Sequence, residues 1–104
     1  MKTNYLMSLM AFVALALVGC GENPRIAEIE ALVGDAETGA PLYEANCRWC
    51  HGSNGRGAHS MYPGGTLSPN LIETILEGLS GMPSFDNLSN QEIADIVAYI
   101  ETFD

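Results

Sequence analysis

The residues that most clearly predict chemistry are Cys47, Cys50 and His51, in the stretch CRWCH at 47–51. This C-x-x-C-H spacing is typical of a covalently attached haem. Two thiols three positions apart on one helical turn can each bond a vinyl group of the porphyrin. The histidine directly after the second thiol can then bind the iron as an axial ligand. Because such a cofactor exchanges single electrons readily, the motif predicts electron transfer.

A second axial ligand must come from elsewhere in the chain unless that side of the iron stays open. Beyond the N-terminal region, His59, Met61 and Met82 are the side chains that could supply it. We favour Met82, which lies in the segment GMP at 81–83 between two expected helices. Glycine lets the backbone approach the ring, and proline stiffens the loop that presents the sulfur. Ligation by histidine and methionine raises the reduction potential relative to two histidines and fills both axial positions.

The N-terminal segment has the pattern of an export signal. Lys2 precedes an apolar run over residues 5–18, and small residues lead up to Cys20. The residues LVGC at 17–20 resemble a bacterial lipobox, in which the cysteine becomes a lipidated N-terminus. We therefore expect a signal peptide over 1–19, a lipidated N-terminus and tether over 20–33, and a haem domain over 34–104. A retained membrane anchor and an incidental thiol are the alternatives.

The charge balance is strongly acidic, with a formal net charge of −9. Once Lys2 is removed with the signal, Arg25, Arg48 and Arg56 are the cations that remain. No basic patch is available to meet phosphates, which argues against nucleic-acid binding. The acidity favours redox partners with basic docking surfaces, although it could equally serve solubility.

Helical patterns dominate the rest of the chain. Residues 24–33 can form a short helix that either packs on the domain or only spaces it from the membrane. A helix leads into the haem motif, although Pro41 requires either a start near Thr38 or a kink. The dipeptide at 68–69 begins another helix, and a capping box at 89–92 begins the last. No segment alternates polar and apolar residues long enough to predict a strand, so the fold class is all-α.

Three segments together resemble the small monohaem class I cytochromes c, especially short bacterial ones tethered as lipoproteins. They are CRWCH at 47–51, GMP at 81–83 and IVAYI at 96–100. The resemblance covers about residues 34–103 and implies several helices around one covalent haem c. Two filled axial positions favour an electron carrier rather than an enzyme, and the export signal with its lipobox predicts a location in the periplasm or at the cell exterior, anchored to a bacterial membrane by lipid. The resemblance to this family agrees with both. It further implies that the Pro63 carbonyl binds the His51 ring, and that the first and last helices cross near Gly39 and Tyr99.

Other functions stay open from the residues alone. A peroxidase-like enzyme or haem subunit would need an open iron site. Cys47, Cys50, His51 and His59 could be counted as zinc ligands, although adjacent ligands suit a tetrahedral site poorly. A disulfide oxidoreductase lacks the expected strand–helix–strand context. Trp49, between the two thiols, is either an exposed docking residue or a packed ring, and we favour packing.

Overall fold

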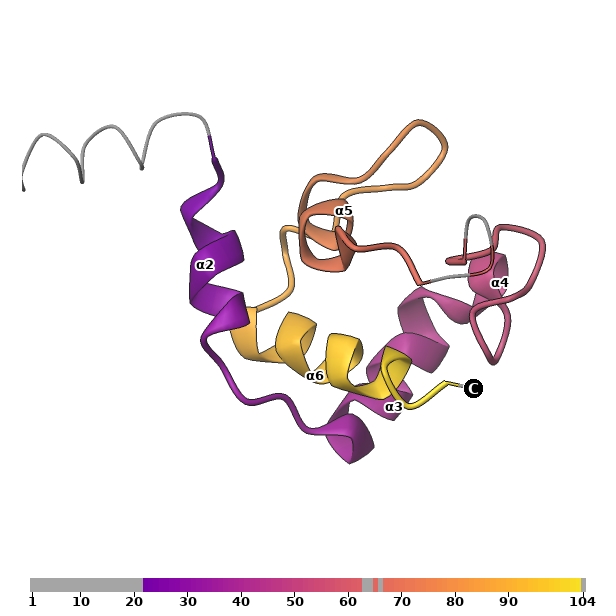
Figure 1. Ribbon diagram of the computed structural model, residues 1–104, viewed down its shortest axis with the longest axis horizontal. Helices are drawn as coiled ribbons and strands as arrows, with labels where there is room; N and C mark the ends of the chain where they lie inside the picture. Colours follow the sequence, from indigo (N-terminus) through magenta and orange to yellow (C-terminus); the bar gives the residue numbers. More distant parts are fainter. Residues whose placement is uncertain (1–21, 63–64, 66, 104) are drawn as a thin grey trace, which may run out of the picture.

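The computed structural model describes residues 22–62, 65 and 67–103, and within them the chain is helical. The elements are α2 (Pro24–Glu30), α3 (Ala36–Asn46), α4 (Arg48–His51), α5 (Leu71–Glu77) and α6 (Asn90–Ile100) (Figure 1). Pairing between extended segments is limited, in this part of the chain, to one isolated bridge between Leu79 and Met82. The predicted signal segment, Cys20 and Pro63 lie outside the described residues.

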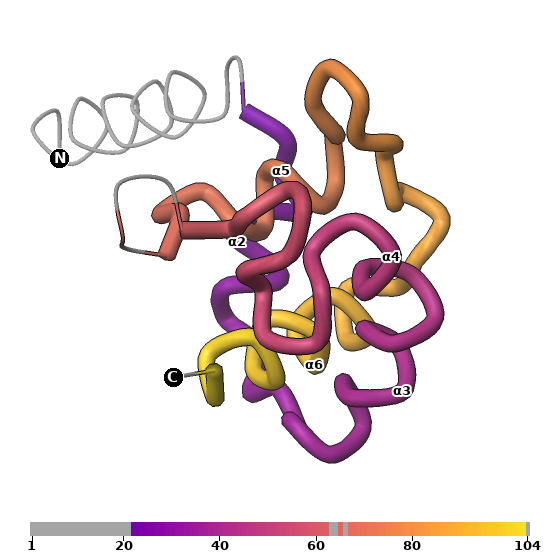
Figure 2. Tube along the Cα trace, turned by 90° about the vertical axis from the view of Figure 1, so that its right-hand side faces the viewer, coloured from indigo at the N-terminus to yellow at the C-terminus, as the bar shows by residue number. Residues whose placement is uncertain are grey.

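The crossing of α3 and α6 forms the centre of the fold, and Figure 2 shows the two helices side by side. They approach closely because Gly39 has no side chain. A Cβ atom built on Gly39 would lie 1.9 Å from the backbone carbonyl oxygen of Asp95 on α6. The crossing near Gly39 that the resemblance implied is therefore present.

An aromatic cluster fills the space beside this crossing. Tyr43 of α3 is fully buried, and its ring centroid lies 5.5 Å from that of Tyr99 and 5.2 Å from that of Phe103. Tyr99 and Phe103 meet edge to face at 5.2 Å. Such tilted contacts suit the aromatic quadrupole and add to the apolar area that the rings bury. The C-terminal end of α6 is thus fixed to the helix that leads into the haem motif.

Of the two alternatives at Pro41, the start near Thr38 is wrong, because helix α3 begins at Ala36 and continues through Pro41. The Asp35 carboxylate explains the earlier start, since it accepts hydrogen bonds from the Glu37 amide at 3.0 Å and the Thr38 hydroxyl at 2.9 Å. These bonds also hold the pKa of Asp35 below its usual value. Pro41 deprives the helix of one hydrogen bond, but it does so on an exposed face where water can replace the bond.

The N-terminal helix α2 packs on the domain. It contacts α5 and α6, and its Ile29 side chain is only 1% exposed. Asn23 caps the helix through a 3.0 Å bond to the Arg25 amide, and proline occupies the first position. Val33, expected on the same apolar face, is 90% exposed because the helix ends at Glu30. The structure thus favours the packed alternative over a simple spacer.

The last two helices begin differently. The predicted capping box at Ser89 and Glu92 is confirmed, with the two reciprocal bonds at 3.1 and 2.9 Å. By contrast, α5 begins at Leu71 rather than directly after Ser68, because residues 69–70 form a turn ahead of the helix. Its N-cap is Asn70, whose side chain makes no capping hydrogen bond. Over residues 22–62, 65 and 67–103, no helix is both long enough and apolar enough to cross a membrane.

Candidate haem site

Helix α4 carries the C-x-x-C-H motif as a single short helical segment. Cys47 is its N-cap and is 7% exposed, whereas Cys50 is exposed. Burial raises the pKa of Cys47 to about 11. A thiol that stays protonated is a weak nucleophile, which disfavours disulfide-exchange chemistry here.

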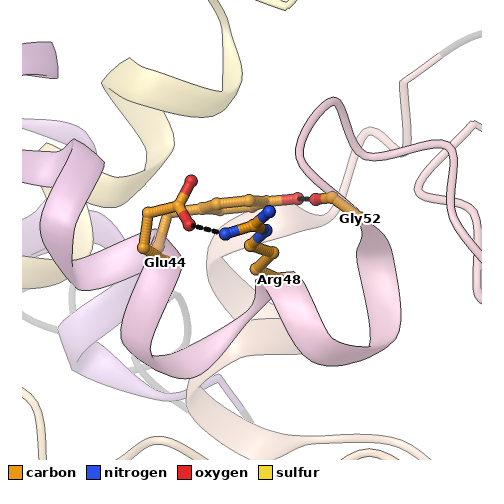
Figure 3. Close-up of polar contacts among 4 residues, drawn as sticks. Glu44, Arg48 and Gly52 are labelled. Atoms are coloured by element: carbon orange, nitrogen blue, oxygen red, sulfur yellow. Dashed lines mark hydrogen bonds and ion pairs between the residues drawn. The ribbon is translucent and has the colours of Figure 1, made fainter.

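Two contacts fix α4 against α3. The Arg48 guanidinium pairs with the Glu44 carboxylate at 2.9 Å, and the Tyr43 hydroxyl donates to the Gly52 carbonyl at 2.6 Å (Figure 3). Burial, and less strongly the neighbouring Cys47 thiol, raises the pKa of Tyr43 to about 12. The hydroxyl therefore keeps its proton and can hold the end of α4 at neutral pH.

The orientation of the His51 ring is set by a backbone carbonyl. Its Nδ1 atom lies 2.5 Å from the carbonyl oxygen of His59. The loop between them is closed by a bond from the Gly57 amide to the His51 carbonyl at 2.8 Å and one from the His59 amide to the Cys50 carbonyl at 2.9 Å. With Nδ1 as the donor, Nε2 is the nitrogen that can bind a metal. The resemblance assigns this role to the Pro63 carbonyl, and Pro63 lies outside the described residues.

Two adjoining cavities, with volumes of about 180 and 310 Å³, lie between α4, α5 and the loop after α5. Both are lined by Cys47, His51, Ser60, Leu79 and Met82. The first is completed by Met61, Ser68, Leu71, Thr74, Ile75 and Ile100. The second is completed by Asn46, Cys50, His59, Ser80, Gly81, Pro83 and Phe85. Among these lining residues there is no aspartate, glutamate, lysine or arginine.

A tight turn presents Met82 to both cavities. The amides and carbonyls of Leu79 and Met82 bond each other at 2.8 and 3.1 Å, and Gly81 adopts a φ of +83° within the turn. Gly78 is also in the left-handed region, at +73°, and a Cβ built there would lie 2.6 Å from the Met82 carbonyl oxygen. Glycine is therefore required at position 78 both by its φ and by the close approach of the turn.

The competing ligands are placed less favourably. Met61 is buried and lines one cavity, but its sulfur faces Gly55, where a built Cβ would lie 3.5 Å from it. His59 is exposed and contributes its carbonyl to His51.

Trp49 is 92% exposed, so the expectation that its ring packs is wrong. Within the described part of the chain no three histidine, cysteine, aspartate or glutamate side chains gather as a metal-binding group, which leaves the zinc alternative without support.

Comparison with known proteins decides the family. Residues 34–100 match the family model described as cytochrome c oxidase, cbb3-type, subunit III. The chain belongs to the cytochrome c family. It is 32% identical over 89 residues to a cytochrome c-553-like protein of Synechocystis sp., covering 77% of this chain and 80% of that one. It is 33% identical over 89 residues to cytochrome c-554(547) of Halothiobacillus neapolitanus, covering 66% and 97%.

A third relative, cytochrome c6 of Bryopsis maxima, is 32% identical over 82 residues, covering 64% of this chain and 90% of that one. No solved structure gives a significant match. The all-α class I fold, the covalent haem c and the role as a small monohaem electron carrier are confirmed by these relationships. The cavities fit such a group, because they adjoin both thiols and border the His51 and Met82 side chains.

Proposed function

We propose that this cytochrome carries single electrons through a haem c bonded to Cys47 and Cys50, with His51 and Met82 as axial ligands. The observation that supports this most directly is that His51 and Met82 border the same two cavities, which Cys47 also lines. The haem, when bound, supplies one iron that alternates between the ferrous and ferric states. With both axial positions filled by the protein, electron transfer rather than catalysis on a bound substrate is favoured.

The protein contributes orientation and a dry environment. The His59 carbonyl holds the His51 ring and strengthens it as a ligand. The turn at residues 79–82 fixes the backbone that carries the Met82 side chain. The uncharged, largely apolar lining disfavours the additional positive charge of ferric iron and thereby favours the reduced state. These features predict a positive shift of the reduction potential relative to an exposed haem.

Redox partners with basic docking surfaces are the proposed electron donors and acceptors. The net charge of −9 supports long-range attraction to such surfaces. Acidic side chains also gather between α2 and α5, where Glu22, Glu30, Glu73 and Glu77 line one hollow. The immediate lining of the haem site is neutral by comparison. The long-range attraction of partner proteins and the exchange of electrons would therefore use different parts of the surface.

Spectroscopy of protein produced in cells that attach haem tests the function. We expect covalent haem that survives denaturation, a reversible one-electron redox titration, and no rise in peroxide turnover above that of free haem. Replacing both Cys47 and Cys50 with serine should abolish covalent attachment. A colourless wild-type protein, or rapid peroxide turnover by the intact protein, would contradict the proposal.

Export and lipidation at Cys20 are proposed from the sequence pattern at residues 1–20. A cysteine-linked acyl anchor would hold the domain on a membrane, since each buried methylene contributes about 0.8 kcal/mol. We expect Cys20→Ser to move the protein from the membrane fraction to the soluble exported fraction, as measured by fractionation and by mass of the N-terminal peptide. Continued membrane association of that variant would instead indicate an uncleaved anchor. The matched Ser8→Ala change, inside the apolar run, should leave fractionation unchanged.

A further inference from the structure

Arg25 of α2 binds the segment that joins the Met82 turn to α6. Its Nε donates to the side-chain oxygen of Asn90 at 2.7 Å. Its terminal nitrogens donate to the backbone carbonyls of Asp86 at 2.8 Å and Leu88 at 2.6 Å. One guanidinium thus binds the chain at three points between Asp86 and Asn90, the first residue of α6.

The other side of the same segment is fixed to α5. The Ser84 hydroxyl donates to the Leu76 carbonyl at 2.5 Å, and the Phe85 amide donates to the Ile75 carbonyl at 2.8 Å. Residues 84–88 are therefore held between α5 and α2. Of the two attachments, the one from α2 to the Asp86 and Leu88 carbonyls is made by Arg25, whereas Asn90 also binds Glu28 of the same helix.

The acceptors of Arg25 require the geometry of a guanidinium. All three are neutral oxygens, spread over residues 86–90, and each receives a different nitrogen of the planar group. A charged donor strengthens such bonds, and the fork supplies them at fixed angles, whereas a lysine ammonium is a single point charge. The helix that carries Arg25 is itself anchored by the buried Ile29 side chain. Arg25 and its acceptors therefore both lie on parts of the chain that other contacts also hold in place.

We propose that Arg25 is a positioning residue for Met82, which keeps the sulfur on the iron by fixing the chain that follows it. This inference rests on the proposed axial ligation by Met82. It assigns a role in the redox site to α2, which lies outside the matched family region of residues 34–100. Loosening residues 86–88 increases the fraction of molecules in which the sulfur has left the iron.

Binding of imidazole to the ferric, haem-loaded protein measures that fraction. Imidazole competes for the position of the sulfur, so its apparent affinity rises in proportion to the population without the methionine bond. We expect Arg25→Gln to lower the apparent Kd for imidazole by about tenfold or more, because it removes charge-assisted bonds. The reduction potential should fall at the same time. Arg25→Lys keeps the charge but not the fork, and the same direction is expected for it should the glutamine variant not accumulate.

Two control variants separate positioning from general destabilisation. Ile29→Val weakens the packing of the same helix without touching the Arg25 bonds. Glu28→Gln alters the neighbouring 2.9 Å contact with the Asn90 amide group. Neither should change the imidazole affinity by more than about twofold at temperatures well below unfolding.

The inference is overturned if the Arg25 variants bind imidazole as the wild type does, or if Ile29→Val increases the affinity equally. Failure of the underlying ligand assignment would look different. In that case Met82→Leu itself would bind imidazole no better than the wild type.

Discussion

Replacing Met82 with leucine is expected to lower the reduction potential by on the order of 100 mV or more, within the range of about 0.8 V that axial ligands control. The change removes the sulfur but nearly conserves the volume, so it should destabilise the fold by less than about 1.5 kcal/mol. Haem should stay covalently attached, because the thioether bonds and His51 are unaffected. Redox titration and binding of added ligands to the ferric protein measure the effect.

Met61→Leu is the matched control for this experiment. Met61 also lines the cavity, but its sulfur faces Gly55. We expect its potential and its spectrum to stay close to those of the wild type. If Met61→Leu shifts the potential and Met82→Leu does not, then the assignment of the sixth ligand is wrong.

Replacing Gly39 with alanine is expected to cost about 3 kcal/mol or more of the free energy of unfolding. The added Cβ would lie 1.9 Å from the Asp95 carbonyl oxygen, and both partners are helical backbone, so neither can move aside like a flexible side chain. A domain of this size has a free energy of unfolding of roughly 5–15 kcal/mol. Much of its stability would therefore be lost, and thermal or denaturant unfolding followed by circular dichroism measures this.

Ala45→Ser provides the comparison on the same helix. Ala45 is exposed, so the change should cost only about 0.5 kcal/mol through helix propensity. Equal destabilisation by the two changes would mean that the close approach of α3 and α6 does not limit stability.

The features that could be predicted from the sequence depend on residues that are close together in the chain, or on a position that only certain residue types can fill. The C-x-x-C-H motif is contiguous, and the capping box at Ser89 and Glu92 depends on residues three apart. Gly39 could be placed at a crossing only through the family resemblance, since no spacing rule identifies its partner. The bridge between Leu79 and Met82 lies in the loop that the sequence predicts. The tight turn that it closes depends on two glycines with positive φ, and the sequence alone does not reveal these φ values.

The features that were missed depend on distant backbone groups. Arg25 binds acceptors more than sixty residues away, and two of them are carbonyls that any residue could supply. The carbonyl that binds the His51 ring is likewise independent of residue type, which is why His59 could not be recognised in that role. The exposure of Trp49 is set by the direction in which α4 leaves α3, and this follows from tertiary packing rather than from the motif.

The docking of α2 has a mechanical consequence for a lipid-modified form of the chain. Only four peptide links separate Cys20 from the start of that helix at Pro24, and fully stretched they reach about 14 Å. With acyl chains on Cys20, so short a linker would confine the cytochrome to a thin layer of water next to the bilayer. The protein would then meet oxidants and reductants embedded in the membrane by lateral diffusion in two dimensions. It would not reach its partners by diffusion through the bulk solution.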